Sequence, residues 1–322
     1  MELPDLLSLY AEDSTLHWLD TQLTTQPATE LRIQLKGLVG SLDALVAAAL
    51  QQRRPRPTLY VLSEREEAAY FQNDLQNLLN KEVFFYPTSY KRPYQYQEVD
   101  NASVLMRAEI LNKLNQPRTE PIQIVTYPEA LFEKVINKRS LLANTFVVRV
   151  GEKLDTAFLS EFLVGYDFDL TDFVYEVGQF SVRGGILDVY SYASEYPYRI
   201  ELFGDEVESI RSFDPNTQLS VESVTHVSIV PDIQQKLTLE SREPFLTFLS
   251  DEYAIWCKDV EFTLEIIEKS FEKAEQALAQ LVSGDIQIVS DPAALFETRR
   301  SFLNQLKTFR TVEFGRRFYF KT

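Results

Sequence analysis

The pattern of apolar and polar positions predicts that strands and helices alternate in the first 144 residues. Four short apolar runs have the length of buried strands, and segments with helical spacing separate them. After the second run, for example, Ala68, Phe71, Leu75 and Leu78 mark one face of a helix. The predicted strands are Leu31–Leu35, Thr58–Leu62, Val83–Phe85 and Ile122–Val125. This alternation indicates a doubly wound α/β layer.

A different pattern begins near Thr145, where a helix is followed by strands without helices between them. The breaks between these strands are Gly184-Gly185 and Gly204-Asp205. A glycine at the first position of a two-residue loop favours a type II′ hairpin. The predicted strands are Phe180–Arg183, Ile186–Tyr190, Tyr198–Phe203 and Glu206–Phe213.

Helices return after Val230-Pro231, and the longest is expected from Asp259 to Leu281 with one apolar stripe. Such a stripe is typical of a helix that packs on its own domain, and a dimeric coiled coil is the alternative. The other elements expected here are a helix over Ser241–Leu249, strands over Tyr253–Cys257, Ile286–Val289 and Phe309–Phe314, and a helix from Pro292. We therefore expect an α/β domain made of residues 1–144 and 231–322, interrupted by an inserted α+β domain of residues 145–230 with antiparallel hairpins.

The strand Tyr198–Phe203 is informative because its outer face is unusual. Alternation places Tyr198, Ile200 and Leu202 on a core face and Arg199, Glu201 and Phe203 on the other. An aromatic ring beside an arginine is a typical interface anchor. Alternatively, another layer covers Phe203, and Arg199 neutralises Glu201 and Glu208, which regular pairing would place opposite each other.

The segment GQFSVRGGILDVYSYASEYPYRIELFGDEVESIRSFDPNTQ resembles the UvrB-like N-terminal module of bacterial transcription-repair coupling factors (Mfd). Weaker similarity covers LKGLVGS, FFYPTSYKRPY and IVTYPEAL. The resemblance implies that residues 145–230 are a UvrA-binding domain like domain 2 of UvrB, and that the flanking segments resemble UvrB domains 1a and 1b. Contact residues of the family match Arg183, Arg199 and Phe203. Phe168 stands where the family commonly has an arginine after its Gly-Tyr pair.

Residues 37–44, GLVGSLDA, follow a predicted strand and open a helix, where UvrB has a phosphate-binding loop. Such a loop needs a last glycine, a lysine and a hydroxyl residue, and here Leu42, Asp43 and Ala44 stand at those positions. Asp43 would repel phosphate, and Ala44 cannot bind magnesium. We therefore expect a degenerate helicase-type, P-loop-like site that does not hydrolyse ATP. Its residues are Gly37, Gly40, Ser41 and Asp43.

Composition and net charge argue against several classes of function. The 322 residues carry a net charge of −16, which disfavours strong binding to duplex DNA by this chain alone. We expect the basic cluster Arg53, Arg54 and Arg56 to be a solvated loop. Two histidines and one cysteine do not suffice for the usual zinc sites, and the single Cys257 fits the cytoplasm. No apolar run is long enough to span a membrane.

The leading hypothesis is a binding module without catalytic residues or a cofactor of its own. The resemblance implies that it recruits UvrA to stalled RNA polymerase in transcription-coupled excision repair. ATP, magnesium, RNA polymerase and duplex DNA would engage other domains of the full protein. The alternative is an active, UvrB-like, ATP-dependent helicase subunit, and a third possibility is a structural fragment whose acidity serves solubility.

Overall fold

The computed structural model describes residues 3–89, 101–116, 120–231, 242–282, 291–315 and 317–320. The chain forms two compact units. The first takes in residues 1–98, 117–135 and 242–322, and the second takes in residues 99–116 and 136–241. The first unit is thus assembled from segments far apart in the sequence. The expected domain boundaries at residues 145 and 231 stay a prediction.

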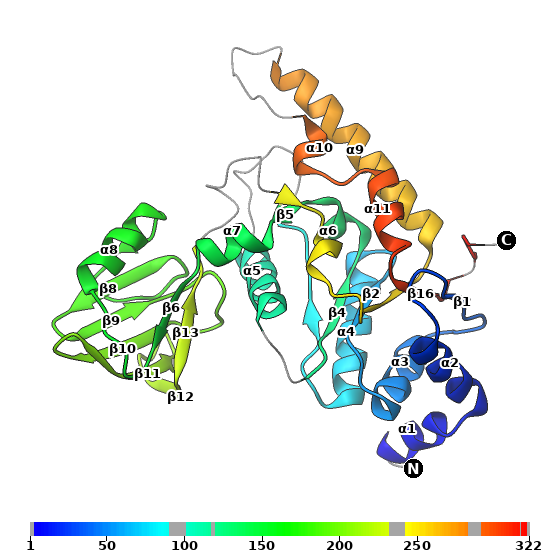
Figure 1. Ribbon diagram of the computed structural model, residues 1–322, viewed down its shortest axis with the longest axis horizontal. Helices are drawn as coiled ribbons and strands as arrows, with labels where there is room; N and C mark the ends of the chain where they lie inside the picture. Colours follow the sequence, from blue (N-terminus) through cyan, green and yellow to red (C-terminus); the bar gives the residue numbers. More distant parts are fainter. Residues whose placement is uncertain are drawn as a thin grey trace. The chain divides into compact units, whose positions relative to one another are not determined.

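A six-stranded parallel sheet forms the centre of the first unit (Figure 1). Its strands, in spatial order, are β1 (Arg32–Gln34), β16 (Arg310–Glu313), β15 (Ala254–Cys257), β2 (Thr58–Val61), β4 (Gln123–Thr126) and β3 (Phe84–Phe85). Every residue of β2, β4 and β15 is buried. Continuous burial is what a parallel sheet covered on both faces requires, because neither face of its strands meets water.

Helices cover both faces of this sheet. Right-handed crossovers from β1 through β2 to β3 place α3 (Leu42–Arg53) and α4 (Arg65–Leu79) on one face. The opposite direction of travel from β4 through β15 to β16 places α6 (Pro128–Phe132) and α9 (Val260–Val282) on the other. The remaining helices of this unit are α1 (Leu3–Ala11), α2 (Ser14–Thr25), α10 (Pro292–Leu295) and α11 (Arg299–Leu306).

The apolar stripe of α9 is buried within the chain. Val260, Leu264 and Ile267 are fully buried, and α9 contacts α6, α10 and α11. These contacts confirm that α9 packs on its own unit. The three buried residues are therefore not available to form the apolar interface of a coiled coil.

The segment after residue 241 differs from the expectation. The predicted helix over Ser241–Leu249 is wrong, because the chain forms β14 (Arg242–Glu243) and a short 3₁₀ helix, η3 (Phe245–Phe248), and β14 pairs with β5 (Val135–Ile136). Pro244 lies between them and disfavours helical backbone in the residue before it. The predicted strand Ile286–Val289 lies outside the described residues.

The second unit contains a six-stranded sheet in which every pairing except β7–β8 is antiparallel (Figure 1). In spatial order its strands are β12 (Ser220–Val224), β11 (Glu206–Phe213), β10 (Tyr198–Phe203), β9 (Ile186–Val189), β8 (Gln179–Arg183) and β7 (Asp169–Leu170). The same unit contains a separate two-stranded sheet of β6 (Phe146–Arg149) and β13 (His226–Ile229). Its helices are α5 (Asn101–Asn115), α7 (Lys138–Ala143) and α8 (Thr156–Gly165). The hairpins expected from the sequence are confirmed.

The core of the second unit lies on one face of this sheet. Leu159 and Leu163 of α8 pack with Leu187 and Ile200 of the strands, and all four are fully buried. Phe168 belongs to the same core, with its ring edge-on to Tyr192 at 5.5 Å. The position where the family commonly has an arginine therefore serves packing in this chain.

Both hairpin loops have the predicted glycine geometry. Gly184 and Gly204 adopt φ values of +60° and +69°, and the residues that follow them are not in the positive region. A positive φ at the first loop position alone is what a type II′ turn needs. Gly185 is constrained differently, because a Cβ there would lie 2.8 Å from the carbonyl oxygen of Leu202. The two glycines thus serve a turn and a close approach between strands.

Candidate protein-binding face

Polar side chains occupy the face of the second sheet that is opposite the core. Strand register places Ser181 beside Asp188, Asp188 beside Arg199, and Arg199 beside Arg211. Neighbouring residues such as Leu187 and Ile200 point into the core, so alternation directs this row to the other face of the sheet, where Ser181 and Asp188 are nevertheless buried. Distant parts of the sequence therefore bring several charges together.

Asp188 is the centre of a hydrogen-bonded group that joins two of the predicted contact residues. Its side chain is completely buried. Arg199 donates from Nε to Oδ1 at 2.7 Å and from Nη2 to Oδ2 at 2.8 Å. Arg183 donates from Nη2 to Oδ2 at 2.5 Å. We call Arg183, Asp188 and Arg199 the Asp188 cluster.

Aromatic rings flank both guanidinium groups of the Asp188 cluster. The guanidinium of Arg199 lies 4.5 Å from the centroid of Phe213, and that of Arg183 lies 4.5 Å from the centroid of Phe173. Stacking of this kind favours the charged form and fixes the plane of the group. Hydrogen bonding to Asp188 also raises the pKa of Arg199 above its ordinary value. Both arginines are therefore held as oriented cations.

The expected opposition of Glu201 and Glu208 is wrong. A bulge between Glu201 and Leu202 shifts the register, so Glu201 faces Ser209. Its carboxylate accepts hydrogen bonds from Ser209 Oγ at 2.8 Å and from Arg211 Nη2 at 2.6 Å. The alternative interpretation was right that Arg199 binds an acid of its own chain, but that acid is Asp188.

Phe203 lies at the end of β10, next to the loop of its hairpin, with 81% of its surface exposed. The backbone N–H of Leu202 donates to the carbonyl of Gly185 at 2.8 Å, so the two hairpin ends lie side by side. None of the described residues covers the Phe203 ring. The predicted docking residue is thus accessible, near the end of the strand that carries Arg183.

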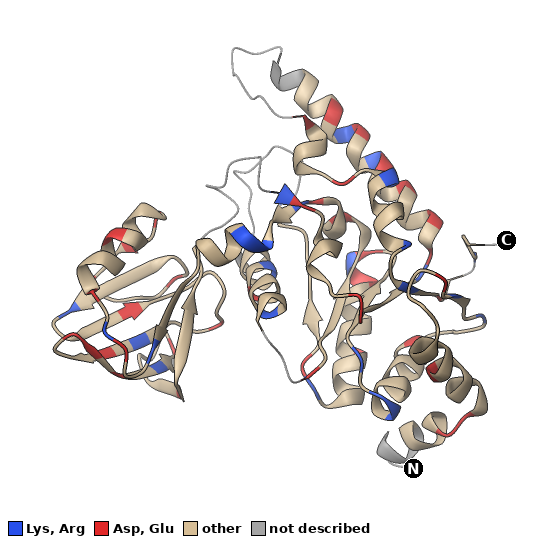
Figure 2. Cartoon of the chain, viewed as in Figure 1, with Lys and Arg blue, Asp and Glu red and all other residues tan. Residues whose placement is uncertain are grey.

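The charged side chains of this face are mixed in sign. Its hydrogen-bonded groups are three arginines and two carboxylates, and strand register also places Glu206 opposite Phe203 on the same face. The arginines are therefore balanced by carboxylates rather than in excess of them. Figure 2 shows positive and negative residues mixed along these strands. Such a surface suits a partner that presents acidic groups to the arginines and an apolar recess to Phe203.

The residues predicted to form a degenerate nucleotide site lie in the first unit, between β1 and α3. Gly37 and Gly40 have φ values of +81° and +62°, and Ser41 precedes α3 without a side-chain capping bond. Asp43 is buried, and its carboxylate lies 3.6 Å from Lys258 Nζ. Lys258 also contacts Glu67.

Burial raises the pKa of Asp43, and the hydrogen bond from the backbone of Ala44 and the charge of Lys258 oppose this shift. Lys258 directly follows β15 and donates its backbone N–H to Val61 at 2.9 Å. The carboxyl edge of the parallel sheet thus supplies a lysine to Asp43 from a distant segment.

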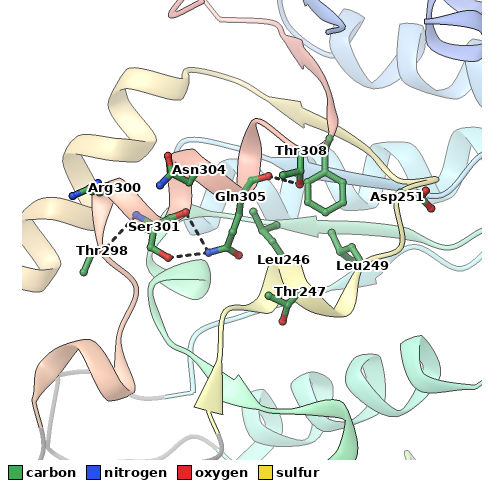
Figure 3. Close-up of a pocket in the computed structure, with 11 residues that line it drawn as sticks. Leu246, Thr247, Leu249, Asp251, Thr298, Arg300, Ser301, Asn304, Gln305 and Thr308 are labelled. Atoms are coloured by element: carbon green, nitrogen blue, oxygen red, sulfur yellow. Dashed lines mark hydrogen bonds between the residues drawn. The ribbon is translucent and has the colours of Figure 1, made fainter. Parts of the chain in front are cut away.

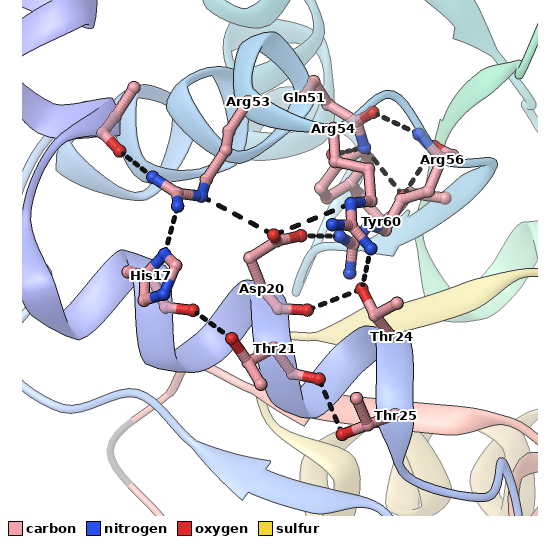
Figure 4. A network of polar contacts seen from close by, with 12 residues as sticks. His17, Asp20, Thr21, Thr24, Thr25, Gln51, Arg53, Arg54, Arg56 and Tyr60 are labelled. Atoms are coloured by element: carbon pink, nitrogen blue, oxygen red, sulfur yellow. Dashed lines mark hydrogen bonds and ion pairs between the residues drawn. The ribbon is translucent and has the colours of Figure 1, made fainter.

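The basic cluster near residue 54 is not simply a solvated loop. Arg53, Arg54 and Arg56 all form ion pairs with Asp20 of α2, whose side chain is 5% exposed (Figure 4). His17 contacts Arg53 in the same network. The expectation failed because the pairing is non-local, and the cluster fastens α2 to the end of α3.

A cavity of about 680 Å³ lies between η3 and α11 in the first unit (Figure 3). Leu246, Leu249 and Phe309 supply apolar walls, and Asp251 is the one carboxylate among its described lining residues. Gln305 turns its amide toward Ser301 and Glu297. These groups form no arrangement of nucleophile and base.

The described residues also offer no metal centre or reactive thiol. No group of three or more His, Cys, Asp or Glu side chains among them could hold a metal ion. Burial raises the pKa of Cys257 to about 12, so its thiol is not ionised at neutral pH. In the parts of the chain that the structure describes, no helix is both long and apolar enough to cross a bilayer.

Sequence reasoning missed the residues that hold the predicted arginines. Asp188 belongs to the VRGGILD motif, and its polar side chain between Leu187 and Val189 was an available signal. Phe173 and Gln218 lie 10 residues before Arg183 and 19 residues after Arg199, and no local pattern connects them with these partners. Gln218 accepts a hydrogen bond from Arg199 Nη2 at 3.1 Å.

Residues 146–234 match the family model of the UvrB interaction domain. Curated relatives are similar over a larger part of the chain. A transcription-repair-coupling factor of Myxococcus xanthus is 34% identical over 218 residues, which is 66% of this chain and 18% of the relative. That of Bacillus subtilis is 32% identical over 199 residues, 61% of this chain and 17% of the relative.

A third relative, the transcription-repair-coupling factor of Escherichia coli, is 24% identical over 194 residues, 60% of this chain and 17% of the relative. The chain therefore spans less than a fifth of the length of these relatives. The matched family model contains the whole polar face described above, including Arg183, Arg199 and Phe203.

Proposed function

The chain is a relative of the transcription-repair-coupling factors that contains a UvrB interaction domain, and from this relationship we propose that it recruits UvrA through the second sheet. The recruitment would bring excision repair to a stalled RNA polymerase in the cytoplasm. RNA polymerase, duplex DNA and ATP would engage other domains of a longer protein. In this proposal residues 1–144 and 231–322 form the scaffold, and residues 145–230 form the UvrA-binding domain.

The observation that carries the proposal is the exposed Phe203 beside a preformed polar face that contains two oriented arginines. A phenylalanine exposed to 81% contributes almost nothing to the stability of its own unit. Arg183 has five N–H groups, of which two are directed to Asp172 and Asp188, so others can meet acceptors on a partner. A buried aromatic anchor with flanking arginines is the usual composition of a binding hot spot.

The test is a calorimetric titration of UvrA with this chain and with two phenylalanine variants. Phe203→Ala should weaken binding by more than about 1–2 kcal/mol. Phe158→Ala is the matched control, because Phe158 lies on α8 of the same unit and is 57% exposed. Equal affinity of the Phe203→Ala variant and the unaltered chain would rule out this surface.

We further propose that the loop over residues 37–44 does not hydrolyse ATP. The support is Asp43, which stands where the lysine of a phosphate loop is needed and is already paired with Lys258. A phosphate entering there would meet a buried carboxylate, and Lys258 is shared with Glu67 as well.

An ATPase assay with and without DNA tests the rival helicase function. We expect no turnover above the background of the preparation. Turnover that disappears when Gly40 or Ser41 is changed would contradict the proposal, because it would locate hydrolysis in this loop. The matched control is a variant in which Gly151 is replaced by the same residue as Gly40, because Gly151 lies in the second unit.

A further inference from the structure

Asp188 is the feature of the second sheet that the predicted contact residues do not explain. Its carboxylate is completely buried and accepts three hydrogen bonds from two arginines. Burial of a carboxylate is costly unless cations and hydrogen bonds compensate for it. Here both compensating cations, Arg183 and Arg199, are residues proposed to meet UvrA.

We infer that Asp188 is a positioning residue of the UvrA-binding face, which holds Arg183 and Arg199 in the geometry that the partner meets. The inference rests on the proposed function of this face. Without the Asp188 carboxylate, the guanidinium groups of Arg183 and Arg199 would lose the anion that both of them bind, and their like charges would favour separation. Each long side chain would then also lose freedom on binding, which weakens association.

The contacts around Arg199 fix the orientation of its guanidinium group. Asp188 binds the guanidinium along one edge, the Phe213 ring lies 4.5 Å from it, and Gln218 accepts from its Nη2 at 3.1 Å. Gln218 has a φ of +62°, an uncommon conformation for a residue other than glycine. Its Nε2 donates to the carbonyls of Val174 and Pro215 at 3.2 and 2.8 Å.

Arg183 is held in a matching way from the other side of Asp188. Its Nη1 donates to the carbonyl of Asp172 at 2.5 Å, and Phe173 stacks on its guanidinium. Ser181 donates from Oγ to the same carbonyl at 3.0 Å, so the loop before β8 is fixed to the strand. The Asp188 cluster is therefore preformed, and the two arginines still keep N–H groups for a partner.

The experiment is a double-mutant cycle measured by calorimetric titration of UvrA with the 322-residue chain. Asp188→Asn removes the charge and keeps the shape. We expect it to weaken binding by about tenfold or more in the unaltered chain. In a chain that already carries Arg183→Ala and Arg199→Ala, the same change should weaken residual binding by less than about twofold.

Asp20→Asn is the matched control, because Asp20 is also a buried aspartate held by arginines but belongs to the first unit. It should lower thermal stability and leave the affinity for UvrA unchanged. An equal loss from Asp188→Asn in both backgrounds would overturn the inference, since it would mean that Asp188 only supports the fold.

If Asp188→Asn does not fold, Asp188→Glu keeps the charge and displaces the carboxylate by one methylene. A folded Asp188→Glu variant with weakened binding supports positioning, and one that binds as tightly as the unaltered chain refutes it. Failure of the proposed function has a different signature, because then the unaltered chain itself does not bind UvrA.

Discussion

Replacing Phe203 by alanine separates binding from folding more cleanly than any other change on this face. The side chain is 81% exposed, so the folded chain loses almost no apolar burial when the ring is removed. We expect the free energy of unfolding to change by less than about 0.5 kcal/mol.

The loss of affinity follows from the area that a partner would cover. A phenylalanine buries about 150–250 Å² when fully enclosed, and four-fifths of that range is about 120–200 Å². At about 25 cal/mol per Å² this corresponds to about 3–5 kcal/mol as an upper limit. Alanine keeps part of the area and ordering at the interface costs some of the gain, so about 1–3 kcal/mol is the expected loss.

Calorimetric titration with UvrA measures this loss, and urea denaturation of the same samples measures stability. Arg199→Ala provides an instructive contrast, because it leaves the buried Asp188 with Arg183 alone. It should weaken binding and also lower the free energy of unfolding by about 1–3 kcal/mol. Full affinity of Phe203→Ala, or a large loss of its stability, would refute the reasoning.

Three further changes test the first unit, the second sheet and the loop over residues 37–44. Asp20→Asn should lower the free energy of unfolding by about 2–4 kcal/mol because three arginines lose their shared carboxylate, and an unchanged urea midpoint would contradict this. Gly185→Ala should cost about 1–3 kcal/mol, since its Cβ would lie 2.8 Å from a backbone oxygen of Leu202, and an unaltered melting temperature would speak against that contact. Burial raises the pKa of Asp43 above 3.8 in the folded chain. The protonated carboxyl group therefore stabilises the fold fully below pH 3.8, and this contribution is lost as pH rises through the raised pKa. Asp43→Asn should therefore gain stability relative to the unaltered chain as pH rises above 3.8, and a relative loss would show that the charge of Lys258 dominates instead.

The hairpins were predictable because their information is local. Glycines at 184 and 204 mark turns, and alternating residues between them place each side chain on a face. The bulge at Glu201 was not predictable, because nothing in the alternation of that strand interrupts it. It moves Glu201 away from Glu208 and toward Ser209 and Arg211.

The predicted contact residues Arg183, Arg199 and Phe203 came from a family resemblance, and the sequence could not show what surrounds them. Asp188 pairs with Arg199 only through strand register, and Phe173 reaches Arg183 only through the fold of a loop. The ion pairs of Asp20 with Arg53 and Arg56 are equally non-local. Such contacts join residues that no periodicity connects.

Docking of UvrA at the hairpin ends of the second sheet is tested most directly by amide hydrogen exchange of this chain, measured with and without saturating UvrA. We predict new protection at the loops around Gly184 and Gly204 and at the strand end near Phe203. Protection confined to the first unit, with these loops unchanged, would contradict it.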